Sequence, residues 1–391
     1  MEKSSPTSQT PPCECEKQKE KRQNTLNNLL RDSAFKGHII NVKKWIKAGA
    51  EFDVNENDEL IDLDLLVSDN KHLINTDTRK VFTALHSVIM GGVLGGHLGE
   101  KTRGHYEVAE FLLKKGANPN SEFKTISKQG KFVKFTPALL AIYRNNISIL
   151  KLLITYGADL NYKNYVEEDP RFEGQGLLYQ AIILKHFETV EFLVEKGIDI
   201  KYADRYGRTP LHYAVKECDF KIVKLLLANG ADLNAMAFEG YNKTPIQAAV
   251  YGGNLKMVKL LIEHGADINS KKELEKELSP LHIAVYNKNY EIVEFLLENG
   301  ADVNQRHYDQ DKGISTTPLH LACRNGGHNN IAEILMKYGA DIDAMELQNW
   351  TPLHHAACGG LHLIVRNLLK KGIHILIFFY QIESLDKPQQ M

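Results

Sequence analysis

The sequence predicts an all-α solenoid of stacked helix-turn-helix repeats. Three stretches between residues 207 and 304 repeat one pattern: TPLHYAV with KIVKLLLANGADLN, TPIQAAV with KMVKLLIEHGADIN, and SPLHIAV with EIVEFLLENGADVN. Two sets of residues recur every 35 positions: Thr209, Thr244 and Ser279, and Gly230, Gly265 and Gly300. A fixed period of about 20–50 residues indicates supersecondary units that stack on similar neighbours.

Each copy contains the signals for two short helices. Thr209 is a good N-cap, and Pro210 occupies the first helical position, where a missing N–H removes no helical hydrogen bond. The second helix carries apolar residues at helical spacing and stops at Gly230, which suits the positive φ of a helix C-terminus. Two short helices cannot bury this much apolar surface alone, so the copies must pack on one another.

The motifs resemble those of ankyrin repeats. TPLHYA (209–214), TPLHLA (317–322) and the helix end GADLN (230–234) match the pattern of that family, with a period close to its roughly 33 residues. The resemblance extends over residues 25–372. It implies about nine helix-turn-helix repeats joined by β-hairpin-like turns.

The copies differ in regularity along the chain. Residues 1–24 are rich in Ser, Thr, Pro, Glu and Lys and are expected to be disordered. The first copy lacks the Thr-Pro cap, and the fourth reads Gly176-Leu177-Leu178-Tyr179 in place of TPLH. Insertions are expected at 51–80, 91–104, 121–135, 162–175 and 305–315, with a short helix near residues 60–67. The apolar tail 373–391 is interpreted as a cap on the ninth repeat, or else as a truncated end.

Composition limits the partners and the compartment. A net charge of −1 with 25% charged residues argues against nucleic acid as the main partner. Five irregularly spaced cysteines do not make a disulfide framework and favour a reducing interior. No apolar run is long enough to span a bilayer. We therefore expect a monomer in the cytoplasm, with the nucleus as the alternative.

No motif for catalysis or for a cofactor stands out. The glycine-rich segment GGVLGGHLGEKTRG (91–104) approaches a phosphate-binding loop, but Glu100 separates Gly99 from Lys101 and a helix precedes it. We interpret it as a flexible loop between two repeat helices. One histidine per repeat suggests hydrogen bonding between turns more than metal binding, which needs convergent ligands: His86, His212, His282, His320 and His354. Three cysteines within repeat helices are interpreted as small core residues: Cys218, Cys323 and Cys358.

The resemblance to ankyrin repeats implies a concave face, lined by first helices and turn tips, on which a partner binds. The residue two positions after the alanine of TPLHxA should point there, together with the residue that follows it. The candidates for partner binding are Tyr143 and Arg144, Ile183 and Leu184, Lys216 and Glu217, Tyr251, Tyr286 and Asn287, Arg324, and the turn-tip residues Tyr206 and Tyr241. Tyrosine and arginine are enriched among interface anchors. The alternative is that a tyrosine at this position packs on the next repeat.

The sequence is compatible with three functions. The first is a non-enzymatic scaffold that binds another protein. The second is a substrate-recognition or regulatory subunit of a larger complex, such as a ubiquitin-ligase adaptor or a phosphatase regulatory subunit. The third is an enzyme with its active site in residues 51–135, and the incomplete phosphate-binding loop is the only feature that supports it.

Overall fold

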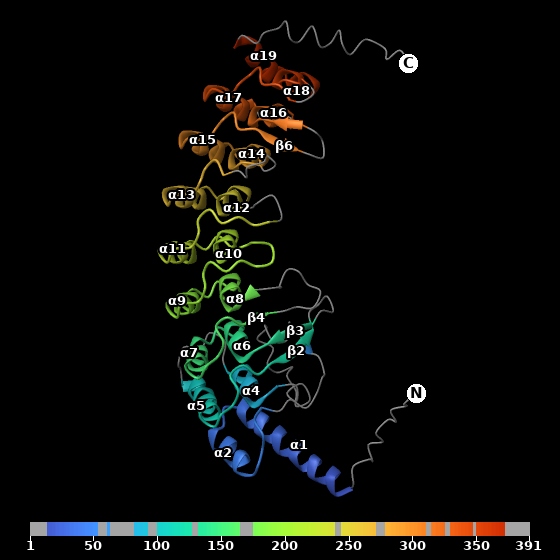
Figure 1. Ribbon diagram of the computed structural model, residues 1–391, viewed down its shortest axis with the longest axis vertical. Helices are drawn as coiled ribbons and strands as arrows, with labels where there is room; N and C mark the ends of the chain where they lie inside the picture. Colours follow the sequence, from blue (N-terminus) through green and yellow to red (C-terminus); the bar gives the residue numbers. More distant parts are fainter. Residues whose placement is uncertain are drawn as a thin grey trace, which may run out of the picture. The chain divides into compact units, whose positions relative to one another are not determined.

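The computed structural model divides into two compact units, Met1–Ile200 and Lys201–Met391, which we call unit 1 and unit 2. It describes residues 14–53, 61–62, 82–92, 100–126, 132–164, 175–238, 244–270, 278–309, 314–324, 329–346 and 349–371. Both units are built mainly from pairs of antiparallel helices, each pair packed on the next pair along the chain (Figure 1). The predicted all-α solenoid of helix-turn-helix repeats is confirmed.

Unit 1 pairs its helices in chain order. They are α1 (Glu14–Phe35) with α2 (Ile39–Lys47), α4 (Ala84–Gly91) with α5 (Glu100–Lys114), α6 (Pro137–Tyr143) with α7 (Ile147–Thr155), and α8 (Leu177–Ile183) with α9 (Phe187–Glu195). Its strands are β1 (Ile61–Asp62), β2 (Phe123–Ile126), β3 (Phe132–Phe135), β4 (Lys163–Asn164) and β5 (Gln175–Gly176).

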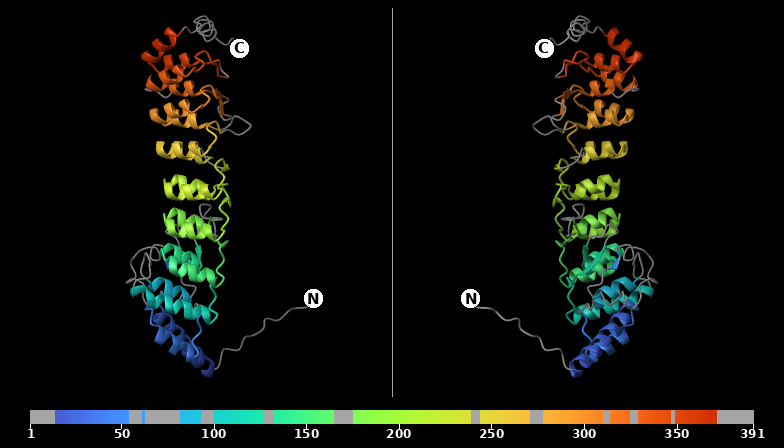
Figure 2. Two further views of the ribbon diagram at one scale, coloured as in Figure 1. Left: turned by 90° about the vertical axis from the view of Figure 1, so that its left-hand side faces the viewer. Right: turned by 90° about the vertical axis from the view of Figure 1, so that its right-hand side faces the viewer.

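Unit 2 continues the same plan with more regular repeats. Its helix pairs are α10 (Pro210–Lys216) with α11 (Phe220–Ala228), α12 (Pro245–Tyr251) with α13 (Leu255–Glu263), α14 (Pro280–Tyr286) with α15 (Tyr290–Glu298), α16 (Pro318–Arg324) with α17 (Asn329–Lys337), and α18 (Pro352–Cys358) with α19 (His362–Lys370). Strands β6 (His307–Asp309) and β7 (Ile314–Thr316) form the one hairpin in the described part of this unit. In unit 2 the even-numbered first helices lie in one row and the odd-numbered second helices in another (Figure 1), and successive helix pairs are stacked one above another (Figure 2).

The capping residues act as the sequence predicts. Thr244 Oγ1 accepts the N–H of Gln247 at 3.4 Å, and Gln247 Oε1 accepts the N–H of Thr244 at 2.9 Å. Pro245 follows at the first helical position. At the other end of the repeat, Gly230 has a φ of +83°, and a Cβ there would meet nothing within 4 Å. Glycine is therefore favoured at this position by the positive φ, and not by a lack of space for a side chain.

The core runs between the two helix rows of each unit. In the repeat of α10 and α11, the side chains that fill it are almost fully buried: Leu211, Val215, Ile222, Val223 and Leu226. The same positions are apolar and buried in the next three repeats, whereas in the repeat of α18 and α19 Ala357 is exposed and Val365 half-buried. Each repeat thus completes the core of the one before it, which is why a single copy does not suffice.

One expectation about the N-terminal part is wrong, and a second is only partly tested. Residues 14–24 belong to α1 rather than to a disordered segment, and residues 1–13 lie outside the described residues. Glu, Lys, Gln and Arg favour helix, so low apolar content here predicted a lack of burial and not a lack of helix. Of the range 60–67, for which the sequence predicts a short helix, residues 61–62 form β1, whose Ile61 pairs in parallel with Thr125 of β2, and the other residues lie outside the described part of the chain.

Three insertions carry antiparallel strand pairs in the part of the chain that the structure describes: 121–135, 162–175 and 305–315. β2 and β3 pair antiparallel with Phe123 opposite Phe135, and β6 pairs with β7 with His307 opposite Thr316. The glycine-rich segment follows helix α4, as expected, and its last residues form the start of α5, while residues 93–99 lie outside the described residues. The tail after Lys371 also lies outside them, so its interpretation as a cap stays a prediction.

Candidate functional site

The last residues of the first helices in unit 2 form a row of exposed side chains. We call this set the first-helix row: Lys216 of α10, Tyr251 of α12, Tyr286 of α14, Arg324 of α16 and Cys358 of α18. Each of these helices contacts the next. The repeat therefore places five side chains of four chemical kinds at equivalent points of successive helices.

The two tyrosines of the row are strongly exposed. Tyr251 is 54% and Tyr286 59% accessible. Neither phenol makes a hydrogen bond to any described residue, whereas the amide of Asn287 donates to the backbone carbonyl of Tyr251 at 3.1 Å. The backbone is thus held between these two repeats while both rings face solvent. Exposed aromatic rings on a rigid support are typical of protein-binding surfaces.

Tyr143 of unit 1 shares the sequence position of these tyrosines but not their environment. Its hydroxyl donates to Oε1 of Gln180 on α8 at 3.0 Å, and its ring lies 5.1 Å from that of Phe135 on β3. Burial raises the pKa of Tyr143 to about 12. This tyrosine fits the alternative interpretation, in which it packs on the next repeat.

The prediction that Arg144 contacts a partner is wrong. Arg144 is completely buried, and its Nη2 donates to the carbonyl of Gly92 at 3.4 Å. It follows the last residue of α6, and its guanidinium turns towards the preceding repeat. A residue beyond a helix end no longer follows helical periodicity, so the pattern could not place this side chain.

The remaining predicted residues divide by exposure. Lys216 and Arg324 are exposed, and the half-buried residues are Ile183, Leu184, Glu217, Asn287 and Tyr206. Tyr241 lies outside the described residues. A partner-binding role for each of these residues stays a prediction.

A turn tip of unit 2 is organised by a carboxylate that the sequence did not single out. Buried Asp204 accepts four hydrogen bonds, from the N–H groups of Tyr206 and Arg208 (both 2.9 Å), from Nε of Arg208 (3.0 Å) and from the hydroxyl of Tyr213 (2.8 Å). Arg208 also stacks over the Tyr206 ring, 4.5 Å from its centroid. The signal available in the sequence is an acidic residue five positions before the Thr cap.

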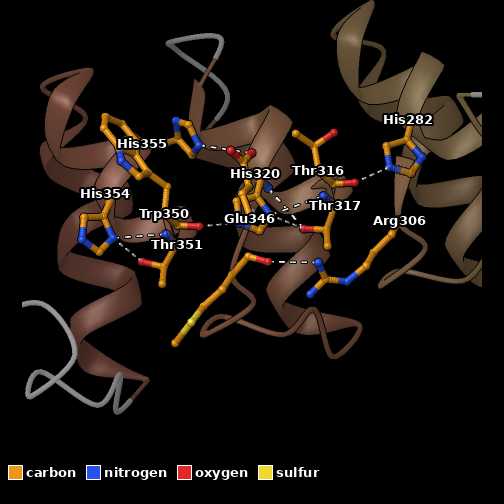
Figure 3. A network of polar contacts seen from close by, with 11 residues as sticks. His282, Arg306, Thr316, Thr317, His320, Glu346, Trp350, Thr351, His354 and His355 are labelled. Atoms are coloured by element: carbon orange, nitrogen blue, oxygen red, sulfur yellow. Dashed lines mark hydrogen bonds and ion pairs between the residues drawn. The ribbon is translucent and has the colours of Figure 1, made fainter. Parts of the chain in front are cut away.

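The last turn of unit 2 repeats this arrangement with different chemistry. Glu346 also lies five positions before a Thr cap and is also buried, but its Oε1 lies 3.3 Å from Nε2 of His355 (Figure 3). His355 occupies the position that Tyr213 occupies in the earlier repeat. Asn349, with a φ of +59°, takes the place of Gly207, whose φ is +77°. The two turns thus share a backbone shape and a buried carboxylate.

The repeated histidines join repeats by hydrogen bonds. Nε2 of His282 donates to the carbonyl of Thr316, and Nε2 of His320 to that of Trp350, both at 3.3 Å (Figure 3). The Nδ1 atoms lie 2.7 and 2.8 Å from the hydroxyls of Ser279 and Thr317. Burial is the main cause that lowers the pKa of His282 to about 3 and that of His320 to about 4. Within the described ranges, no three His, Cys, Asp or Glu side chains group to hold a metal ion.

The cysteines only partly follow the prediction. Cys323 is buried, which raises the pKa of its thiol to about 12. Cys218 and Cys358 are exposed, so their assignment to the core is wrong. Cys218 lies beyond the end of α10 with a φ of +56°, and Cys358 is the last residue of α18 on the first-helix row. Both are at helix ends, where the burial pattern of the helix no longer holds.

These features define a repeat protein whose helix pairs stack along the chain. Residues 138–237, 238–307 and 306–378 match the family of ankyrin repeats in three copies, and residues 82–122 match the single ankyrin repeat. Together these matches cover more than half of the sequence. The chain belongs to the ankyrin repeat family, whose repeats are protein–protein interaction modules.

Relatives of known sequence or structure support the same conclusion. The chain is 35% identical over 134 residues to alpha-latrocrustotoxin-Lt1a of Latrodectus tredecimguttatus, and 26% identical over 155 residues to ankyrin repeat and SOCS box protein 6 of Pongo abelii. These stretches are 34% and 38% of this chain but only 8% and 34% of the relatives. The ankyrin repeat domain of Bcl-3, a member of the IkappaB protein family, superposes with a TM-score of 0.51 at 28% identity. The superposition covers 60% of this chain and 98% of that domain.

The described helices are all too short or too polar to cross a bilayer.

Proposed function

We propose that this protein is a non-enzymatic scaffold that binds another protein through the first-helix row of unit 2. Exposure of Tyr251 and Tyr286 carries the proposal, because both rings face solvent and their phenols have no hydrogen-bond partner among the described residues. Burying such rings against a partner releases water from large apolar surfaces. The cytoplasm is the compartment we propose for this binding.

The turn tip around Asp204 supplies a second contact region. Phe238 is 68% exposed, and its N–H donates to the carbonyl of Tyr206 at 2.6 Å. Arg205 is exposed and lies over the Tyr206 ring, 5.1 Å from its centroid. We propose that Tyr206 and Phe238 extend the binding surface of unit 2 from the first-helix row to the tips.

Replacing Tyr251 and Tyr286 by alanine together should remove partner binding and leave the fold intact. Truncating exposed side chains usually changes the free energy of unfolding by less than about 0.5 kcal/mol. The measurement is proximity labelling in cells with the full chain, comparing wild type with Y251A/Y286A, alongside thermal unfolding of both proteins. We expect a set of labelled proteins to disappear with the double variant at an unchanged melting temperature.

Tyr143→Phe is the matched control for that experiment. It removes the hydrogen bond to Gln180 but keeps the ring on Phe135. Loss of this part-buried hydrogen bond should lower the free energy of unfolding of unit 1 by about 1 kcal/mol at most, with no loss of labelled proteins. The scaffold proposal fails if Y251A/Y286A keeps every labelled protein, or if it loses them only because it unfolds.

A second candidate function is substrate recognition within a ubiquitin-ligase complex. Similarity to ankyrin repeat and SOCS box protein 6 over 155 residues favours it. Co-purification of ligase components with the full chain would support this function, and labelled proteins without any ligase component would argue for the simple scaffold. A phosphatase regulatory subunit would instead co-purify with a phosphatase catalytic subunit.

A further inference from the structure

The first-helix row of unit 2 carries cations at positions that flank its two tyrosines. Lys216 precedes Tyr251 and Arg324 follows Tyr286 in the order of the stacked helices. Both cations are exposed, and neither forms an ion pair with a described residue. A third exposed cation, Lys288, lies two residues after Tyr286. The row therefore offers two aromatic rings between unneutralised positive charges.

The carboxylates near the row are engaged within the protein. Asp219, which follows the end of α10, accepts the N–H groups of Lys221 and Ile222 at 3.0 and 3.1 Å and caps α11. Glu217 is half-buried and is not a free anion. Neither carboxylate pairs with Lys216 in the described part of the chain. The positive charge of the row is thus left for a partner, which favours an acidic one.

The repeat spacing sets the length of a ligand that reaches all four side chains. Packed helices lie about 8–10 Å apart, and an extended chain in the polyproline II conformation rises about 3.1 Å per residue. One repeat therefore corresponds to about three residues of an extended peptide. Lys216 and Arg324 are separated by three steps, from α10 through α12 and α14 to α16, which corresponds to about nine residues.

We propose that the first-helix row binds an extended acidic segment of a partner protein. Its carboxylates pair with Lys216 and Arg324, about nine residues apart, and apolar side chains at the two intermediate steps pack on Tyr251 and Tyr286. This inference rests on the proposed scaffold function and adds the chemistry of the partner. A segment in the extended polyproline II conformation suits a row that presents one side chain per repeat, because it has three residues per turn, so that every third side chain returns to the same face.

The test uses a labelled synthetic peptide and the full-length protein. The peptide has about ten residues, with glutamate at both ends, leucine at its fourth and seventh positions and serine elsewhere. A second peptide has lysine at both ends, and a third has a scrambled order of the first. A fourth is a helix-forming peptide of about 22 residues, with its contact residues seven positions apart to match the same spacing in a helix. Binding is measured by fluorescence anisotropy at low and high salt.

We expect the glutamate peptide to bind about 10-fold more tightly than the lysine peptide and the scrambled peptide, and its affinity to fall as salt rises. Lys216→Glu with Arg324→Glu should reverse the preference, so that the lysine peptide binds better. Lys224→Glu with Lys256→Glu makes the same change of net charge on the exposed faces of α11 and α13 and should leave the preference unchanged. Thermal unfolding of both double variants checks that these exposed substitutions leave the fold intact.

Other results overturn the inference in distinguishable ways. Equal affinity for the glutamate and lysine peptides, or a preference that K216E/R324E does not reverse, rules out charge recognition by this row. If the helical peptide binds more tightly than the glutamate peptide, the partner segment is a helix and the proposal of an extended segment is wrong. In one further outcome, Y251A/Y286A loses its labelled proteins in cells, but the wild-type protein binds all the peptides equally well. The proposal of an acidic segment is then wrong, and the scaffold function stands. If the labelled proteins persist in that variant, the scaffold function itself fails.

Discussion

Acid is expected to destabilise unit 2 from about pH 6.5 downwards, and the double variant H282Q/H320Q is expected to resist it. Both histidines are buried, and their pKa values are lowered to about 3 and about 4. The unfolded chain therefore takes up protons between pH 6.5 and these values while the folded chain does not. Stability is fully present above the unfolded pKa and is lost as pH falls through this window, by about 1.4 kcal/mol per pH unit for each histidine.

The replacement is taken from the protein itself. Gln247 occupies the equivalent position in α12 and makes the same kinds of contact, accepting from the N–H of Thr244 and donating to the carbonyl of Leu278, both at 2.9 Å. Glutamine should therefore keep both hydrogen bonds of His282 and His320 without a titrating group. At pH 7.5 the free energy of unfolding of the variant should be within about 1 kcal/mol of that of the wild type.

Other charged groups around the two histidines are known from the structure. His307 faces His282, and its proximity lowers the pKa of His282 further. Glu346 and His355 face His320, and Glu346 acts against the effect of burial. These groups remain in the variant, so the difference between the two proteins reports the two substituted histidines.

Tryptophan fluorescence gives a readout confined to unit 2. The sequence contains two tryptophans, Trp45 in unit 1 and Trp350 in unit 2. In a Trp45→Phe background, urea unfolding followed at Trp350 should give a free energy that falls steeply between pH 6.5 and pH 4.5 for wild type, by about 5 kcal/mol in total. The slope should be much smaller for H282Q/H320Q. Identical slopes would show that these histidines do not determine the acid sensitivity.

Asp204→Ala is expected to be the most damaging single substitution at the turn tips. It removes the acceptor of four hydrogen bonds and leaves the buried hydroxyl of Tyr213 and the guanidinium of Arg208 without it. Loss of a buried charged acceptor destabilises a protein by about 3 kcal/mol. Tyr213→Phe removes only one of these bonds and should destabilise the protein by about 1 kcal/mol.

The double variant D204A/Y213F separates the shared interaction from the rest. Both single changes remove the same hydrogen bond. The loss of the free energy of unfolding in the double variant should therefore be smaller than the sum of the two single losses, by about 1 kcal/mol. Urea unfolding at neutral pH measures all three variants. If D204A lowers the free energy of unfolding by less than about 0.5 kcal/mol, the turn keeps its shape without the carboxylate.

The candidate site was only partly predictable, as the three tyrosines illustrate. Tyr143, Tyr251 and Tyr286 share one position of the repeat, and the pattern predicts the same role for each. The residue just before the alanine of the following repeat is Gln180 for the first, but Ile283 and Leu321 for the other two. Only Gln180 can accept a phenol hydrogen bond, so this part of the difference was readable from the sequence. The ring of Phe135 against Tyr143 was not, because it comes from the insertion that forms β3.

By itself, the sequence determined the repeat, the helix caps, the glycine ends and the ankyrin family, because these depend on local backbone geometry and on a period that any copy displays. The tertiary structure alone decided which equivalent side chains are exposed. Arg144 is buried against Gly92, Asp204 organises a turn tip, and Cys358 stands at the end of the first-helix row. Exposure depends on what neighbouring repeats and insertions place beside a residue, and no local pattern records those contacts.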